Sequence, residues 1–228
     1  MSASTMTRVL VFDVNETLLD VGALDPLFSR MFGDASARRE WFGQMLQSAF
    51  VSTITHTYRD FGALGMAALA MIAERHGVTP TDDDRIALRD GMRRLPPHPE
   101  VKEALERLRD AGFRLATLTN STAEVGEIQV TTAGLRDLFE QILSADAVQR
   151  LKPAPEPYRM AAERLDVPID RMRLIAAHAW DIAGALNAGC AAAFVARPGQ
   201  VLDASGAQPD IIGADLGEVA DRILAVDR

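Results

Sequence analysis

The chain has 228 residues, of which 48% are apolar and 25% are charged. This length predicts one or two domains with a core large enough to fold without disulfides. Its 24 basic and 32 acidic residues leave a net charge of −8. That balance argues against a nucleic-acid-binding protein, which needs a basic face, although a small anionic substrate remains compatible with it.

The composition also bears on compartment and cofactors. Cys190 is the single cysteine, so no intrachain disulfide framework exists and a reducing cytoplasm is favoured. The first ten residues lack the apolar stretch of a signal peptide, and the weakly polar runs at 62–73 and 190–196 are too short to span a membrane. The sequence has no HExxH motif and no paired CxxC, so residue spacing indicates no zinc site. We expect a cytoplasmic protein, and we expect it to use no metal or other cofactor.

The first third of the chain predicts one strand followed by helices. Residues 8–12 form a short apolar run typical of a strand buried on both faces. Helical spacing then covers 22–32, 36–55, 61–76 and 82–92. Gly33, Gly77 and Thr79-Pro80 mark helix ends, and Thr81 suits an N-cap. The proline-rich stretch 95–99 predicts a linker.

Beyond residue 99, predicted strands alternate with predicted helices. Strands are expected at 113–118, 140–144, 173–177, 192–195 and 209–212, and helices at 101–111, 122–132, 155–165, 180–188 and 216–226. This alternation predicts an α/β protein with a Rossmann-like parallel sheet, which the strand at 8–12 must join. We therefore expect a core domain of residues 1–20 and 96–228 and an inserted all-helical cap domain of residues 21–95.

Polar residues follow four of the predicted strands. Ligands bind parallel sheets at the carboxyl ends of the strands, so these residues should converge there. They are Asp13, the run Thr119-Asn120-Ser121, Lys152, and the pair His178 and Asp181. Taken singly, Thr119, Ser121 or Asp181 could be a helix N-cap and Lys152 a surface lysine, but the set together favours a site.

Asp13 is the expected centre of this site. A buried carboxylate tends to protonate unless a counter-charge holds it ionised, and Lys152 is the nearest candidate. An ionised and poorly hydrated carboxylate is a capable nucleophile. The N–H groups of Val14, Asn15, Asn120 and Ser121 would form an anion-binding turn beside it.

Four motifs carry a resemblance to a known family. They are FDVNETLLD (12–20), LTNST (118–122), LKPAPEPY (151–158) and AHAWDIAGALNAG (177–189). In this order they resemble the haloacid dehalogenase superfamily, and most closely the type II L-2-haloacid dehalogenases, over essentially the whole chain. The Trp180-Asp181 pair and the KPxPxxY string are the more specific part of the match.

The resemblance implies a two-step hydrolysis of short 2-haloacids. Asp13 would displace halide and form an ester, which water would hydrolyse to a 2-hydroxy acid. Lys152 would neutralise the nucleophile, Thr17 would steady it, and Asp181 would orient or activate the water. The resemblance also implies substrate binding by Thr119 and by the N–H groups of Val14 and Asn120, with the Asn120 side chain facing the halide. It favours a homodimer, and the surface at 50–72 is either cap core or a dimer face.

Two other functions stay open. Phosphatases of the superfamily carry DxDxT, bind Mg²⁺ and use the second Asp as acid and base, whereas Asn15 occupies that position here and cannot transfer a proton. A phosphoester phosphatase is the first alternative. A non-catalytic partner-binding protein with a degenerate site is the second.

Three departures from the family pattern indicate an altered pocket. Phe42 stands where the family has a halide-binding arginine, and Arg38 or Arg39 would have to replace it. Asn15 replaces an aromatic residue, and we include it among the substrate-binding residues. Ala176 and His178 stand where serine and asparagine are usual. His178 is then expected to activate water, to donate to the halide, or to hydrogen-bond Asp13 or Lys152 structurally. Apolar pocket walls are expected from Phe42, Leu46, Phe61 and Trp180.

Overall fold

The computed structural model describes residues 9–227. Arg8, expected to begin the first strand, lies outside the described residues. Within them, the chain forms a six-stranded parallel sheet in the order β3-β2-β1-β4-β5-β6. The strands are β1 (Val9–Phe12), β2 (Leu115–Thr119), β3 (Gln141–Ser144), β4 (Met172–Ala176), β5 (Ala191–Val195) and β6 (Ile211–Gly213). The predicted α/β fold with a Rossmann-like parallel sheet is confirmed.

Helices cover both faces of this sheet. They are α5 (Val101–Asp110), α6 (Ala123–Thr132), α7 (Pro155–Arg164), α8 (Ala179–Ala188) and α9 (Leu216–Val226), with 3-10 turns η2 (Arg136–Leu138), η3 (Ala145–Val148) and η4 (Ile169–Arg171). Alternate residues of β1 serve the two faces, because successive side chains of a strand point to opposite sides. Leu10 and Phe12 pack in the cluster with α5 and α9, and Val9 and Val11 pack in the cluster with α7 and α8.

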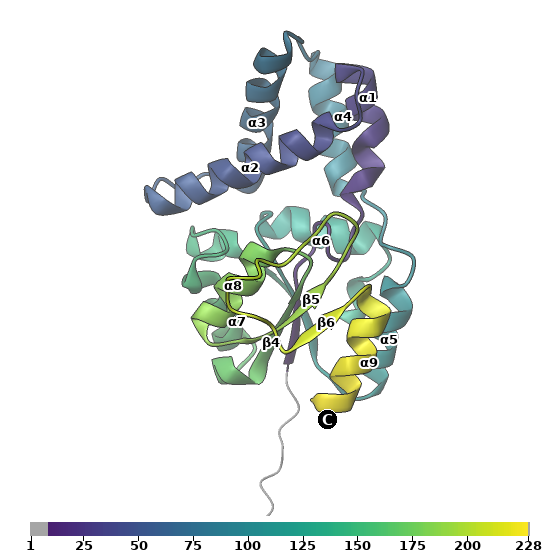
Figure 1. Ribbon diagram of the computed structural model, residues 1–228, viewed down its shortest axis with the longest axis vertical. Coiled ribbons are helices and arrows are strands. Elements are labelled where there is room, and N and C mark those ends of the chain that lie inside the picture. Colours follow the sequence, from purple (N-terminus) through teal and green to yellow (C-terminus); the bar gives the residue numbers. More distant parts are fainter. Residues whose placement is uncertain (1–8, 228) are drawn as a thin grey trace, which may run out of the picture.

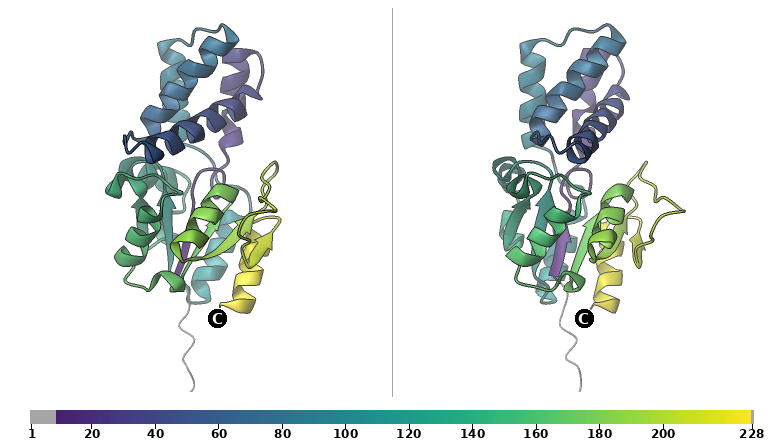
Figure 2. Two further views of the ribbon diagram at one scale, coloured as in Figure 1. Left: turned by 60° about the vertical axis from the view of Figure 1, so that its left-hand side comes forward. Right: turned by 90° about the vertical axis from the view of Figure 1, so that its left-hand side faces the viewer.

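A helical insertion separates β1 from β2. It consists of η1 (Val21–Leu24), α1 (Asp25–Phe32), α2 (Ala37–Ile54), α3 (Phe61–His76) and α4 (Asp82–Arg93). These helices lie together beyond one end of the sheet, and α2 runs across the side nearest the core (Figure 1, Figure 2). The two connections to the core lie side by side, since Asp20 N donates to Pro96 O at 2.8 Å and His98 N donates to Leu18 O at 3.0 Å.

Local sequence signals set the helix boundaries. Thr81 caps α4 in a capping box with Asp84, as its spacing predicts. Gly33 and Gly77 end α1 and α3 in left-handed conformations, with φ of 73° and 64°. The predicted elements differ from the observed ones by at most two residues at an end, except that 22–32 is divided into η1 and α1. No helix within residues 9–227 is both long and apolar enough to cross a bilayer.

Candidate active site

Lys152 is the hub of a buried ion-pair cluster at the carboxyl ends of the strands. Its Nζ donates to Asp13 Oδ1 at 2.9 Å, to Asp181 Oδ2 at 2.6 Å and to Leu118 O at 2.8 Å. The Lys152 and Asp181 side chains are fully buried, and that of Asp13 is 7% exposed. Three residues that are distant in sequence therefore meet, as the strand-end argument predicts.

The electrostatics of the cluster keep Asp13 ionised. Burial alone would raise the pKa of Asp13, but Lys152, His178 and the Thr17 hydroxyl outweigh burial and lower that pKa. Burial would lower the pKa of Lys152, whereas Asp13 and Asp181 raise it. Burial raises the pKa of Asp181, with the Asp13 charge acting in the same direction. The pKa values of the two carboxyl groups are thus shifted in opposite directions. Asp13 becomes a weakly basic nucleophile, and Asp181 becomes its more basic neighbour.

Thr17 fixes the Asp13 side chain. Its hydroxyl donates to Asp13 Oδ2 at 2.7 Å and accepts from Ala177 N at 2.9 Å. The hydroxyl thereby ties the turn after β1 to the end of β4. Both rotation of the carboxylate and separation of the two strand ends are restricted.

Tyr158 is a site residue that the sequence reasoning missed. Its hydroxyl donates to Asp181 Oδ1 at 2.5 Å, and the whole side chain is buried. Burial and the Asp181 charge raise the pKa of this phenol well above its usual value, so it stays protonated. The signal was present in LKPAPEPY (151–158), because a buried tyrosine at the end of that motif needs a hydrogen-bond partner.

Two backbone donors lie beside the nucleophile. Within residues 9–227, the N–H groups of Val14 and Asn120 donate no hydrogen bond, although both residues are buried. Thr119 Oγ1 accepts from Ser121 N at 3.1 Å, which leaves the Thr119 hydroxyl proton available. Unpaired buried N–H groups are costly, so this turn is suited to an anionic oxygen.

The side chains of Asn15 and Asn120 are placed differently from expectation. Asn120 Oδ1 accepts from Lys152 N at 2.8 Å and its Nδ2 donates to Lys152 O at 3.3 Å. The amide that was expected to face a halide thus positions the Lys152 backbone instead. Asn15 Oδ1 accepts from Gln129 Nε2 at 2.9 Å, and Asn15 Nδ2 lies 3.4 Å from Ser121 Oγ. An amide needs several partners when buried, and sequence spacing does not reveal which ones it finds.

His178 lies against the other side of the nucleophile. Its Nδ1 is 3.3 Å from Asp13 Oδ2, and its Nε2 is 2.8 Å from Glu16 Oε2. The imidazole is stacked between Phe42 and Trp180, with ring-centroid distances of 6.0 and 5.1 Å. Within the described residues His178 makes no hydrogen bond to Lys152 or to Asp13, although its Nδ1 is within ion-pair distance of Asp13. Glu16 was not predicted as the partner of His178.

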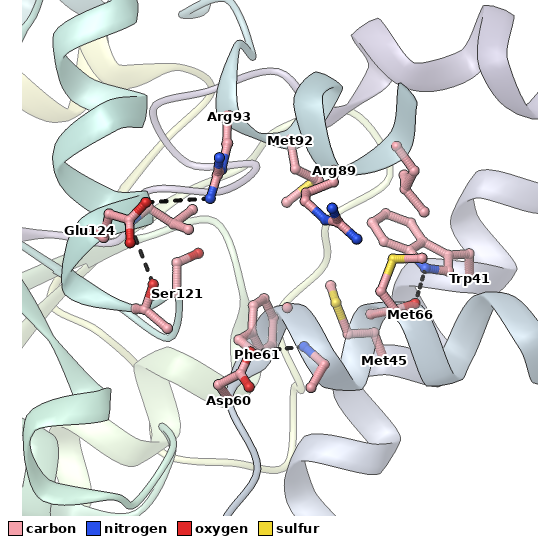
Figure 3. Close-up of a pocket in the computed structure, with 16 residues that line it drawn as sticks. Trp41, Met45, Asp60, Phe61, Met66, Arg89, Met92, Arg93, Ser121 and Glu124 are labelled. Atoms are coloured by element: carbon pink, nitrogen blue, oxygen red, sulfur yellow. Dashed lines mark hydrogen bonds and ion pairs between the residues drawn. The ribbon is translucent and has the colours of Figure 1, made fainter. Parts of the chain in front are cut away.

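The expected pocket walls belong to two separate cavities. One, of about 370 Å³, lies between α2, the N-terminal end of α8 and the loop at 198–201. Its walls contain Phe42, Leu46 and Trp180 together with His178, Arg38 and Arg39. The other, of about 380 Å³, contains Phe61 (Figure 3). Its walls are Trp41, Met45 and Met66, with Arg93 from α4 pointing toward Glu124. Phe61 is therefore placed apart from the other three predicted wall residues.

Arg38 and Arg39 were the candidates to replace the missing arginine. Arg38 is buried, with its Nε 2.5 Å from Asp25 Oδ1 and its NH1 3.6 Å from Glu16 Oε1. Its charge is therefore directed at two carboxylates of the protein. Arg39 lines the 370 Å³ cavity and makes no ion pair with a carboxylate of residues 9–227.

Comparisons with known proteins agree with the geometry. A sequence model of the haloacid dehalogenase-like hydrolases matches residues 7–189. The chain is 30% identical to the (S)-2-haloacid dehalogenase of Pseudomonas sp. (strain YL) over 205 residues, 88% of each protein. It is 29% identical to (S)-2-haloacid dehalogenase 2 of Pseudomonas sp. (strain CBS-3) over 214 residues, 93% of each protein. The structure of L-2-haloacid dehalogenase from Xanthobacter autotrophicus, with chloropropionic acid covalently bound, superposes with a TM-score of 0.90 at 24% identity, over 97% of this chain and 100% of that one.

Proposed function

This chain belongs to the haloacid dehalogenase-like hydrolases, and we propose that it hydrolyses the carbon–halogen bond of short 2-haloalkanoic acids. Haloacetates and L-2-haloacids are the substrates, and 2-hydroxy acids and halide are the products. The observation that carries the proposal is the ionised, nearly buried Asp13 carboxylate, held by Lys152 at 2.9 Å and by Thr17 at 2.7 Å. Relatives named (S)-2-haloacid dehalogenases support the same reaction.

In the first step, Asp13 attacks the halogen-bearing carbon. One carboxylate oxygen forms a bond to Cα while the carbon–halogen bond breaks, and the halide leaves with the bonding electron pair. The low pKa of Asp13 keeps its carboxylate available as a nucleophile, and near-burial limits its hydration. The solved relative with chloropropionic acid covalently bound fits an ester of this kind.

In the second step, water attacks the ester carbonyl and regenerates Asp13. Asp181 is the group we assign to orienting or activating this water. Its pKa is raised by burial, and Tyr158 and Lys152 fix both of its oxygens. A carboxylate with a raised pKa is the better general base. Lys152 balances the charge of Asp13 before the attack and of Asp181 after it.

The substrate carboxylate is assigned to the turn after β2 and to Val14. The N–H groups of Val14 and Asn120 and the Thr119 hydroxyl supply donors that residues 9–227 leave unused. Backbone donors of this kind bind an anion despite the net charge of −8, because screening limits the reach of distant charges. Phe42, Leu46 and Trp180 supply an apolar wall, and we place Phe61 on the opposite side of α2.

Chloroacetate hydrolysis tests the proposal. Wild-type protein should release chloride equally with and without EDTA, and Asp13→Asn should release none. Asp83→Asn, at an exposed position of α4, serves as the matched control and should keep full activity. Phosphate release from a generic phosphoester that requires Mg²⁺ would support the phosphatase alternative. No halide release from any short 2-haloacid would overturn the proposal, and the non-catalytic alternative would then gain support.

Three further expectations stay proposals of ours. The helical insertion acts as a cap domain of residues 21–95 over the core of residues 1–20 and 96–228. The chain forms a homodimer, for which the exposed Val51, Ile54 and Met71 on α2 and α3 offer an apolar face. Light scattering on Ile54→Glu would show a monomer if that face pairs the subunits. The cytoplasmic location rests on the lone Cys190.

A further inference from the structure

His178 lies between two carboxylates, and its Nε2 is hydrogen-bonded to one of them, that of Glu16. Nδ1 lies 3.3 Å from Asp13 Oδ2, and Nε2 lies 2.8 Å from Glu16 Oε2. The side chain is 4% exposed. An imidazole between two carboxylates can satisfy both only when it carries a proton on each nitrogen. The geometry therefore favours an imidazolium whose Nε2–H donates to Glu16 and whose Nδ1–H lies beside the nucleophile without a hydrogen-bond partner among residues 9–227.

The orientation of the His178 ring plane is also fixed. Phe42 stacks on it at an interplanar angle of 21° and Trp180 at 24°. Two parallel aromatic faces leave little room for rotation out of the plane, and an aromatic face attracts a cation. Phe42 is the residue that the family resemblance places at the position of the expected arginine. In this chain the Phe42 ring thus packs against a cation, the imidazolium of His178, that another segment supplies.

Glu16 is held in position by more than the imidazole. Its φ is +62°, a left-handed conformation that favours glycine. Glu16 N donates to Leu19 O at 2.8 Å. Arg38 lies 3.6 Å from Oε1, and Gln200 Nε2 donates to Oε2 at 3.1 Å. A glutamate in a glycine-like conformation whose carboxylate contacts three side chains is a fixed anchor for the ring.

The charges around His178 come from every element packed against it. The turn after β1 supplies Asp13 and Glu16, and α2 supplies Arg38 against Glu16 and Arg39 in the same cavity. Lys152 and, through it, Asp181 act on Asp13, while the loop at 198–201 supplies the uncharged Gln200. Burial disfavours the cationic form of His178, but Asp13 and Glu16 outweigh burial and raise its pKa to about 9.

We propose that Glu16 is a positioning residue that keeps His178 as an imidazolium beside Asp13, so that the free Nδ1–H of this cation stabilises the leaving halide in place of the arginine that the family resemblance leads us to expect at position 42. The proposal rests on the function proposed above. When the Asp13 oxygen bonds to Cα, Asp13 loses its negative charge and the halide takes up the electron pair. His178 Nδ1–H then donates to the halide without transferring its proton, and the halide enters the 370 Å³ cavity that His178 lines.

The first test follows the His178 ring by NMR, which does not depend on turnover. The His178 signal is assigned by its loss in His178→Gln and titrated in wild type, Glu16→Gln and Glu16→Gly. Glycine suits the φ of +62°, so this second variant keeps the test valid if Glu16→Gln folds poorly. Both variants should lower the His178 pKa by about 1–2 units. Glu40→Gln is the matched control, since Glu40 lies 2.6 Å from the exposed His76 and should leave His178 unchanged. An unchanged His178 titration in both Glu16 variants would overturn the proposal.

The second test measures turnover of chloroacetate and bromoacetate against pH. Wild-type kcat should fall above about pH 9, and in Glu16→Gln the fall should begin at lower pH. In His178→Gln, kcat should drop more for chloroacetate than for bromoacetate, because chloride is the poorer leaving group and the stronger hydrogen-bond acceptor. Equal losses for both substrates, or a pH profile unmoved in Glu16→Gln, would refute the role at the halide. If wild type turns over no haloacid, the proposed function and the halide role fail together, while the NMR titration still decides whether Glu16 holds the proton.

Discussion

Replacing Lys152 with methionine removes the ammonium group that lies between the two buried carboxylates of Asp13 and Asp181. The Lys152 ammonium lies 2.9 Å from Asp13 and 2.6 Å from Asp181, and at an effective dielectric constant of about 20 each attraction is about 6 kcal/mol. Desolvation of the three ions offsets much of this attraction. Removing one partner of a buried pair costs about 3–5 kcal/mol, because the other charges stay buried and unpaired. We expect Lys152→Met to lose that much unfolding free energy at pH 7.

The loss should depend on pH with a defined sign. In Lys152→Met the two carboxylates repel each other in a buried site, so their folded-state pKa values rise above those of the unfolded chain. Such groups bind protons more tightly when folded, and the variant should therefore regain stability as the pH falls from 8 to 5. In wild type this gain is smaller, because Lys152 and its neighbours lower the pKa of Asp13 and only Asp181, of the two carboxyl groups, has a raised pKa. The two stability curves should approach each other at low pH.

Urea unfolding followed by circular dichroism, repeated between pH 5 and pH 8, measures this difference. Lys102→Met, at the exposed lysine of α5, should stay within about 0.5 kcal/mol of wild type. The double variant Lys152→Met with Asp181→Asn removes one carboxylate charge as well, and it should recover stability without recovering chloride release. If Lys152→Met stays within about 1 kcal/mol of wild type at every pH, the buried cluster does not carry the charges that we assign to it.

Other substitutions give equally direct outcomes. Gly184→Ala would place a Cβ 2.6 Å from the Tyr158 hydroxyl oxygen, and overpacking of this kind should cost about 1–3 kcal/mol in thermal unfolding. Gly43→Ala, with no atom within 4 Å of its new Cβ, should be neutral or stabilising in the same assay. Tyr158→Phe removes the donor to Asp181 and should cost about 1.5–3 kcal/mol in urea unfolding, together with a lower kcat; an unchanged variant would show that the phenol hydroxyl is dispensable. The pKa of His178 is raised from 6.5 to about 9 on folding, so its contribution of about 3 kcal/mol should be present below pH 6.5 and lost as the pH rises through 9. Comparing wild type with His178→Gln between pH 6 and pH 10 checks this, and a difference independent of pH would contradict it.

Sequence alone determined the architecture and the membership of the ion-pair cluster. Apolar runs and helical spacing carry the period of each element, so the strands and helices could be placed almost to the residue. In a parallel sheet the carboxyl ends of all strands share one edge. Asp13, Lys152 and Asp181 were therefore expected to meet before any distance was known. Those expectations depend on local hydrophobic periodicity and on sheet topology, and both can be inferred directly from the sequence.

Tertiary structure decided which polar atoms are paired. Glu16 and His178 are 162 residues apart, and Asn120 reaches the Lys152 backbone across 32 residues. Tyr158 faces Asp181 across the packed helices α7 and α8. A pairing of this kind depends on rotamers, on the backbone conformation at Glu16 and on what else fills the site. None of these three factors leaves a periodic pattern in the sequence from which it could be predicted.

The apolar residues expected to line the pocket show the same difference between what the sequence predicts and what packing decides. Phe42, Leu46 and Phe61 all suit a pocket by their helical spacing, yet α2 separates Phe61 into a second cavity. Phe42, which we expected at the position of the family's arginine, stacks on His178. Hydrophobic patterning reports that a side chain leaves water, because burial follows apolar area. It does not report which neighbour the side chain meets, since that depends on how the helices pack above the strand ends.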